Sequence, residues 1–125
     1  MDTNRVYRCS KLCGYDVTNP QGESLGKIED FVLDLDTGTV AYAVLSFGGF
    51  LGIGDKYFAI PWQAFSYDTD KGECILNVEK ERLQNAPGFD KDNWPDMASW
   101  EWGRSIYEYY NIEPYWTSRT AGSRY

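Results

Sequence analysis

The sequence predicts a mainly β fold: a small antiparallel β-barrel of about six strands with a short, helical, aromatic-rich C-terminal extension. Residues 12–79 consist of short β-rich runs separated by turn residues, a pattern typical of a small barrel or sandwich. Closure into a barrel would remove the exposed strand edges that promote aggregation. A chain of 125 residues also suffices for one compact domain with its own core. After residue 80 the alternation ends and aromatic residues accumulate.

Six runs are expected to form the strands of this barrel: residues 15–17, 25–35, 40–47, 57–61, 62–67 and 74–78. The second and third runs enclose the turn residues 36–38 and are expected to form a long hairpin. Phe31, Leu33 and Leu35 alternate with other residues along its first strand, which indicates β structure rather than a helix. A bulge is expected at residues 29–30.

Turn residues and one proline mark the ends of several runs. Residues 19–22 and 68–72 combine Asn, Asp, Pro and Gly, which favour tight turns. Pro61 has no backbone N–H, so its strand is expected to end there or to lie at an edge of the sheet.

The region after residue 80 is expected to form a helical extension that packs on the barrel. Residues 80–85 suit a short helical turn that ends before Pro87, and residues 89–98 are expected to be irregular. Ser99 is expected to cap a helix over residues 100–110. The predicted organisation is a flexible N-terminus (residues 1–11), a β domain (12–80), the extension (81–116) and a disordered tail (117–125).

The aromatic residues of the extension allow two interpretations. Trp100, Tyr107 and Tyr110 lie near one face of the expected helix at helical spacing, with Gly103 between them. In the first interpretation they pack against the barrel and cover its apolar surface. In the second they form a surface for a partner or for a dimer, because aromatic residues favour the cores of interfaces. Both interpretations can hold.

The charge of the chain argues against nucleic acids and membranes as partners. The formal net charge is −7 and the sequence pI is about 4.5, whereas a polyanion needs a basic surface. We also find no run of 18 or more apolar residues, so no membrane insertion is expected. The polar N-terminus leads to no apolar signal core, which predicts a cytoplasmic location.

The residue types needed for the commonest catalytic and metal sites are scarce. The chain has no histidine, which removes Ser-His-Asp and Cys-His catalysis. It has three cysteines, and the spacing of Cys9 and Cys13 is not that of a usual zinc pair. With no export signal, these cysteines are expected to be free thiols. We therefore expect no catalytic residues, no metal ligands and no cofactor, and the protein is not predicted to be an enzyme.

The glycine-rich stretch SFGGFLGIGDK, residues 46–56, has the glycine spacing of a phosphate-binding loop. Gly49 and Gly54 are correctly separated, but Asp55 stands where the motif has lysine, and a β-rich run follows instead of a helix. A nucleotide site is therefore not expected. The stretch is instead expected to connect two strands.

Two acidic turns begin like calcium-binding loops. The loop that starts at Asp34 has Leu45 at its twelfth position, where calcium loops have glutamate. The loop that starts at Asp68 has Glu73 at its sixth position, where calcium loops have glycine. Asp and Gly are favoured in hairpin turns for local reasons, so both stretches are interpreted as turns.

Several long strings resemble the PRC-barrel family, which is named for the cytoplasmic domain of the photosynthetic reaction centre H subunit. They are GESLGKIEDF (residues 22–31), DTGTVAYAVLSFGGFLGIGDK (36–56), FAIPW (58–62), NAPGFDKDNWP (85–95) and YYNIEPYW (109–116). The chain is similar to the small bacterial stand-alone branch of that family. The resemblance implies a small β-barrel that serves as an assembly or adaptor domain in contact with other proteins. It implies no catalytic residues.

These observations lead to two functional hypotheses. The first is a non-enzymatic protein-interaction or assembly module that can self-associate as a homodimer and whose binding residues are apolar and aromatic. The residues proposed for partner binding are Phe50, Leu51, Ile53, Trp100, Trp102 and Trp116. In the glycine-rich stretch, the apolar side chains are expected either to plug the barrel end or to form a contact patch. The alternative function is a small-ligand or regulatory module with a pocket between the barrel and the aromatic extension.

Overall fold

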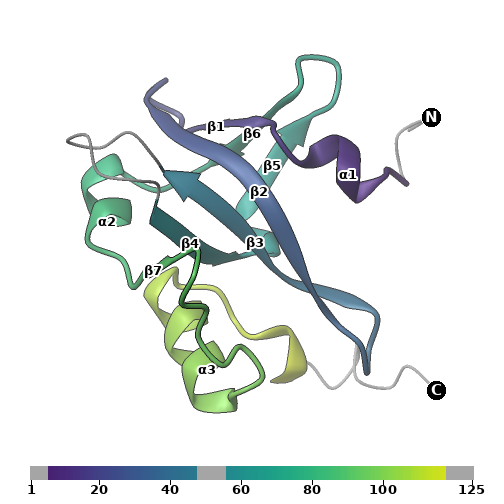
Figure 1. Ribbon diagram of the computed structural model, residues 1–125. Helices are drawn as coiled ribbons and strands as arrows, with labels where there is room; N and C mark the ends of the chain where they lie inside the picture. The colour runs from purple at the N-terminus through teal and green to yellow at the C-terminus, as the bar shows by residue number, and fades with distance from the viewer. Residues whose placement is uncertain (1–5, 48–55, 118–125) are drawn as a thin grey trace.

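A curved seven-stranded sheet forms the centre of the computed structural model, which describes residues 6–47 and 56–117 (Figure 1). The strands are β1 (Asp16–Thr18), β2 (Ser24–Asp34), β3 (Thr39–Phe47), β4 (Lys56–Pro61), β5 (Phe65–Asp68), β6 (Glu73–Leu76) and β7 (Phe89–Asp90). The helices are α1 (Cys9–Leu12), α2 (Lys80–Gln84) and α3 (Trp100–Tyr109), with short 3-10 turns η2 (Trp62–Ala64) and η3 (Tyr115–Thr117). The mainly β prediction with a C-terminal helix is therefore confirmed.

The sheet does not close into a barrel, and the predicted closure is wrong. Its strand order is β5-β6-β1-β2-β3-β4-β7, so within the described ranges β5 and β7 are the two ends. The sheet is also not purely antiparallel, because β1 pairs with β6 in parallel. Pro61 ends β4, as predicted, and the 3-10 turn η2 follows at once. Because of this turn the chain leaves β4, and β5 pairs only with β6 and not with β4.

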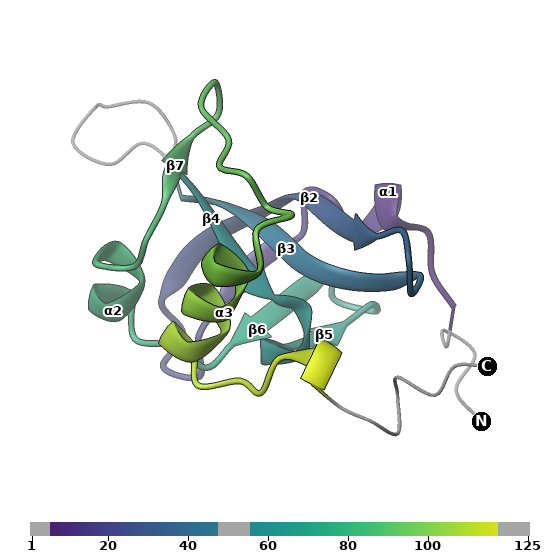
Figure 2. The same cartoon turned by 90° about the horizontal axis from the view of Figure 1, so that it is seen from below.

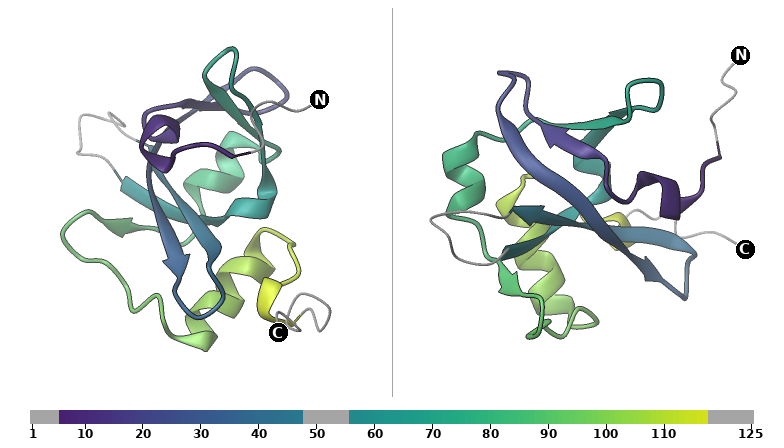
Figure 3. Two further views of the ribbon diagram at one scale, coloured as in Figure 1. Left: turned by 90° about the vertical axis from the view of Figure 1, so that its right-hand side faces the viewer. Right: turned by 45° about the horizontal axis from the view of Figure 1, so that its top comes forward.

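The β2–β3 hairpin is the longest paired unit of the sheet. Its turn is closed by a hydrogen bond from the Gly38 N–H to the Asp34 carbonyl at 2.8 Å, and Gly38 has a φ of 74°. The predicted bulge near residues 29–30 is confirmed by a register shift between Ile28 and Asp30. A second shift lies between Val32 and Leu33. The far end of the hairpin extends beyond the neighbouring strands, toward α3 and η3 (Figures 1 and 3).

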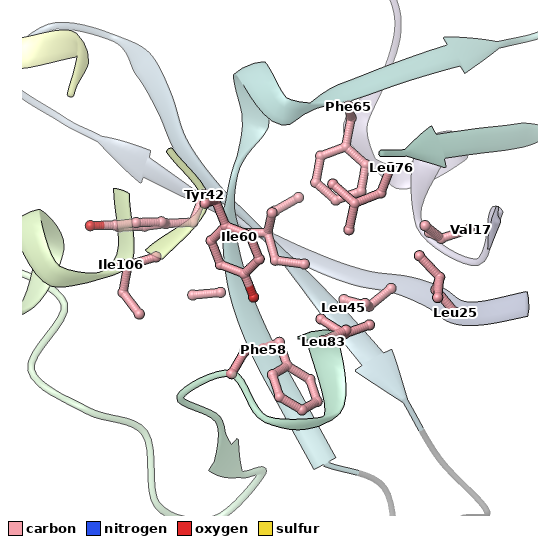
Figure 4. Close-up of a cluster of buried hydrophobic side chains, with 14 of the residues drawn as sticks. Val17, Leu25, Tyr42, Leu45, Phe58, Ile60, Phe65, Leu76, Leu83 and Ile106 are labelled. Atoms are coloured by element: carbon pink, nitrogen blue, oxygen red, sulfur yellow. The ribbon is translucent and has the colours of Figure 1, made fainter. Parts of the chain in front are cut away.

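The core lies between the curved sheet and the helices α2 and α3. Figure 4 shows side chains of the strands β1 to β6, together with Leu83 of α2 and Ile106 of α3, gathered in this space. Leu83 is fully buried, so α2 contributes to the core although it has only five residues. Tyr107 of α3 is also fully buried, and its hydroxyl donates to the Ala41 carbonyl at 2.7 Å. This bond satisfies a buried phenol and fixes α3 to β3.

The capped helix predicted for the extension is present as α3. The Ser99 side chain accepts a hydrogen bond from the Trp102 N–H, which is the predicted capping interaction. Gly103, Tyr107 and Tyr110 are buried, so this face packs on the sheet as in the first interpretation. Trp100 differs, because 58% of its surface is exposed. Figure 2 views the molecule from below, and in this view α3 lies in front of the sheet.

Three local predictions differ from the structure. Residues 9–12 form the short helix α1, although the N-terminus was expected to be flexible. Residues 89–90 were expected to be irregular but pair with β4 as β7, which makes seven strands instead of about six. Residues 62–64, expected to be strand, form η2. The expectations for the tail beyond Thr117 and for the first five residues lie outside the described residues.

Alkaline pH is expected to destabilise this core. Burial raises the pKa of the Cys74 thiol from 9.0 to about 11, and burial raises the pKa of the Tyr42 hydroxyl from 10.0 to about 12. Both groups are neutral acids in the fold, so their contribution is complete below about pH 9 and is lost as pH rises through the folded pKa values. The urea midpoint should therefore fall between about pH 9 and about pH 11. The urea midpoint of Cys74→Ala should fall less over that pH range than the midpoint of the wild type. An equal fall would show that ionisation of Cys74 does not contribute to the loss of stability.

Candidate functional site

An apolar groove lies between the far end of the β2–β3 hairpin and the C-terminal extension. Its volume is about 350 Å³. The hairpin contributes Val32 to Asp36 with Ala41 and Tyr42, and the extension contributes Met97 to Trp100, Gly103, Tyr115 and Trp116. The groove thus joins two parts of the chain that are far apart in sequence and lie side by side in Figures 1 and 3.

The two walls of the groove are joined by a hydrogen bond. The Tyr115 hydroxyl donates to the Asp34 carboxylate across the two segments. Burial raises the pKa of Tyr115, and the hydrogen bond to Asp34 raises it further, so the phenol stays protonated at neutral pH. A protonated Tyr115 keeps its donor hydrogen, and η3 is therefore tied to the hairpin turn.

Gly103 allows α3 to approach the sheet closely at the floor of the groove. A Cβ atom at this position would lie 2.6 Å from the Tyr42 hydroxyl oxygen and 3.2 Å from a ring carbon of Trp116. Any side chain there would displace one of these aromatic rings. The glycine therefore has a packing role, and its backbone φ is that of an ordinary helix residue.

Aromatic packing supports the wall formed by the extension. Trp116 packs against Trp100 and against Tyr107, with ring centroids 5.2 Å apart in each case. Tyr107 is fully buried, so the chain Tyr107–Trp116–Trp100 leads from the core to the surface. This arrangement holds the exposed Trp100 ring at the groove without burying it.

Exposed apolar side chains surround the groove. Leu33 is 52% exposed and Leu35 is 86% exposed at the hairpin end, and Trp100 is 58% exposed on the opposite wall. All three line the groove. Scattered single apolar residues are common on protein surfaces, but a cluster around one concave site is characteristic of a binding surface.

The charged residues that line the groove are both acidic. Asp34 is the last residue of β2 and Asp36 lies in the hairpin turn, and the Asp34 side chain also accepts the Asp36 N–H at 2.9 Å. Among the described lining residues there is no lysine or arginine. The groove therefore combines apolar walls with negative charge at one end.

A second, smaller cavity of about 170 Å³ lies by the same hairpin. It is lined by Phe31 and Val40 of the hairpin together with Tyr7, Cys9, Leu12, Trp62, Tyr67 and Thr69. Trp62 stacks on Tyr67 at a centroid distance of 6.0 Å, and Phe31 packs edge-on against Trp62. These rings pack on one another, and the cavity has about half the volume of the groove, so it is the weaker candidate.

The sequence-predicted binding residues have different outcomes. Trp100 and Trp116 lie together in the groove. Trp102 does not line it and packs against Tyr42, with ring centroids 5.3 Å apart. The predictions for Phe50, Leu51 and Ile53 lie outside the described residues.

Sequence reasoning missed the hairpin side of the groove. Leu33 and Leu35 were taken as part of the alternating pattern of a barrel strand, whereas the structure exposes both. A hairpin that is longer than the neighbouring strands leaves such residues without a strand to cover them. The sequence did contain a signal for this exposure, because the expected hairpin strands were longer than the other expected strands. Asp34, which was placed in the expected strand and weighed as the start of a calcium-like loop, anchors Tyr115 instead.

Within residues 6–47 and 56–117, no three His, Cys, Asp or Glu side chains are grouped so that they could hold a metal ion. In the same residues, no helix has the length and apolar character that crossing a membrane requires. The three cysteines are free thiols, as predicted, and only Cys74 is buried.

Solved structures include a partial match to this chain. No curated protein matches the chain. A solved structure from Pseudomonas aeruginosa, assigned as the 16S ribosomal RNA processing protein RimM, is 20% identical with a TM-score of 0.43. That match covers 65% of this chain, and the chain spans only 50% of the RimM structure.

The family comparison covers six of the seven described strands of the sheet and ends before most of the extension. The model of the PRC-barrel domain matches residues 4–83, which includes β1 to β6 and the hairpin side of the groove. The other wall of the groove, from Met97 to Trp116, lies outside the match. Since the match covers well over half of the 125 residues, the chain belongs to the PRC-barrel domain family.

Proposed function

We propose that this protein is a non-enzymatic interaction module that binds a partner protein in the groove between the hairpin and the extension. The observation that carries the proposal is the cluster of Leu33, Leu35 and Trp100, three exposed large apolar side chains around one groove. Burial of such side chains drives most protein association, and tryptophan is enriched among the residues that contribute most to binding.

The ionisable groups of the groove are poorly suited to acid–base catalysis. Burial raises the pKa of Tyr42 to about 12, and burial and the Asp34 hydrogen bond raise that of Tyr115 still further. A general acid or base works best with a pKa near the operating pH. Asp34 accepts hydrogen bonds from Tyr115 and from the turn, which is a structural use of its carboxylate. Binding fits these groups better than catalysis.

The test compares two exposed tryptophans. Trp100 lines the groove, whereas Trp94 is 42% exposed and packs on Tyr57 and Phe89 away from it. The source cells express a tagged form of the wild-type chain, of Trp100→Ala or of Trp94→Ala. Each tagged chain is purified, and the proteins bound to it are quantified by mass spectrometry. We expect Trp100→Ala to lose the partner by about tenfold or more, because truncated interface anchors commonly contribute about 2 kcal/mol.

The Trp94→Ala chain should keep the partner at the wild-type level. Thermal unfolding of all three chains checks that they are folded. Leu35→Ser, an exposed change on the opposite wall, should reproduce the loss seen with Trp100→Ala. If both groove variants retain the partner, the groove is not the binding surface.

A small-ligand or regulatory module is the second candidate, because the volume of about 350 Å³ falls within the range of about 300–1,000 Å³ typical of ligand pockets. A thermal-shift screen with metabolites tests it. A saturable rise in melting temperature for one class of compound, absent in Trp100→Ala, would favour this function over protein binding.

A further inference from the structure

We infer that the partner segment seated in this groove is positively charged, with an arginine or lysine next to an apolar anchor. The inference rests on the proposed function and specifies the chemistry of its partner. It follows from three properties of the same site: the sign of its charges, the exposed aromatic face and the apolar floor.

The charges in and beside the groove are mostly negative. Asp34 and Asp36 line the hairpin end. Asp96 and Glu101 adjoin the lining residues of the opposite wall in sequence. Arg104 follows Gly103 on α3 but is not among the lining residues. The net charge of −7 adds to this local field, so the groove attracts cations and repels anions.

The aromatic wall also favours a cation. The Trp100 ring is more than half exposed and packs on Trp116 at a centroid distance of 5.2 Å. Tryptophan is the side chain whose ring face attracts ammonium and guanidinium groups most strongly. Guanidinium can also pair with a carboxylate through two hydrogen bonds. One wall therefore offers an aromatic face and the other offers carboxylates.

The floor of the groove requires an apolar group as well. Val32, Ala41 and Met97 contribute no charged atoms to it, and Leu33 and Leu35 extend the apolar surface outward. A purely ionic partner would leave this area exposed to water. A segment that places an aliphatic or aromatic side chain beside its cation matches both features.

A second copy of this chain is a poor occupant of the groove. A two-fold contact through the groove would place Asp34 and Asp36 of both copies in one interface, with no lysine or arginine among the described lining residues to offset the four carboxylates. Like charges in an interface oppose association. Charge complementarity therefore favours a basic segment of another protein.

The hairpin turns supply a matched pair of variants for the test. The Asp36 N–H donates to Asp34 Oδ1 at 2.9 Å, and the Asp70 N–H donates to Asp68 Oδ1 at 3.0 Å in the β5–β6 turn. Asp36 lines the groove and Asp70 does not. Asp36→Asn thus removes a charge from the groove, and Asp70→Asn removes the same charge elsewhere and leaves the net charge equal.

The experiment selects peptides from a random phage-displayed library on the full wild-type chain. The selected peptides are also tested for binding to Trp100→Ala. Peptides that bind the wild type but not this variant are the groove-dependent ones. We expect these to be enriched in arginine or lysine beside a large apolar residue. The strongest peptide is then synthesised and titrated by calorimetry against wild type, Asp36→Asn and Asp70→Asn. Asp36→Asn should weaken binding about threefold to tenfold, and Asp70→Asn should not.

Two controls on the peptide side complete the design. Replacing its basic residue with glutamine should weaken binding to wild type more than to Asp36→Asn. Raising the salt concentration from about 50 mM to about 500 mM should reduce affinity for wild type more than for Asp36→Asn, because salt screens charges at the surface.

The possible results distinguish a failure of this inference from a failure of the proposed binding function. Groove-dependent peptides without basic residues, or equal affinity for Asp36→Asn and wild type, overturn the charge inference and leave the binding function intact. If no selected peptide depends on Trp100, both fail. A wild-type chain that is a dimer by light scattering, and that Trp100→Ala turns into a monomer, identifies a second copy as the occupant and also overturns the inference.

Discussion

Gly26→Ala is expected to destabilise the fold by about 3 kcal/mol or more. Gly26 lies in β2 with a φ of 126°, a conformation that side chains strongly disfavour. A Cβ atom there would lie 2.2 Å from the Ser46 carbonyl oxygen, which belongs to the backbone of β3. Backbone cannot rotate away as a side chain can, so both strands would have to move. Urea denaturation followed by circular dichroism measures the loss.

Gly38→Ala is the matched control for this change. Gly38 also has a positive φ, 74°, but no atom lies within 4 Å of the position of its Cβ. This substitution should therefore destabilise the fold by only about 1 kcal/mol, the cost of placing a residue with a Cβ atom in a left-handed backbone conformation. If the two variants lose equal stability, the close approach of Gly26 to β3 is not what makes glycine necessary there.

Tyr107→Ala is expected to destabilise the protein by about 3–5 kcal/mol, as is usual for the loss of a large buried aromatic side chain. Tyr107 is fully buried, packs on Tyr42 and Trp116, and donates a hydrogen bond to the Ala41 carbonyl. The variant loses this packing and leaves a cavity between α3 and the sheet. Because Trp116 rests on Tyr107, the variant should also disturb the groove.

Two further variants separate the contributions of Tyr107. Tyr107→Phe keeps the ring and removes only the hydroxyl, which donates to the Ala41 carbonyl and lies 3.5 Å from Gln63 Oε1, so a loss of about 1–2 kcal/mol is expected. Tyr67→Ala, at a tyrosine that is 53% exposed, should lose less than about 1 kcal/mol. Denaturant titration of the three variants should give the order Tyr107→Ala, Tyr107→Phe, Tyr67→Ala; any other order would contradict the proposed role of the buried ring.

Features that depend on neighbouring residues could be predicted from the sequence. The Ser99 cap, the end of β4 at Pro61, the bulge near residue 29 and the Gly38 turn all follow from one residue and its neighbours in the chain. The resemblance to the PRC-barrel family, carried by long strings, also proved correct.

Predictions that depended on distant pairing were less successful. Alternation along residues 25–35 identifies a strand but does not say where its neighbours end, so Leu33 and Leu35 were assigned to a barrel strand and their exposure was not predicted. The parallel pairing of β1 with β6 joins residues more than fifty positions apart and leaves no local signature. Among the binding candidates, Trp100 and Trp102 are two positions apart on α3, and only the packing against Tyr42 separates their roles.

The sequence by itself determined six of the seven described strands, most turns, the capped aromatic helix, the acidic charge and the family, because each depends on local pattern, composition or motif. Only the tertiary structure decided that the sheet stays open and that the hairpin end meets the extension to form an acidic, apolar groove. The physical reason is that a groove requires two walls. Its walls are joined by Tyr115 and Asp34, side chains 81 positions apart whose contact exists only once the chain has folded.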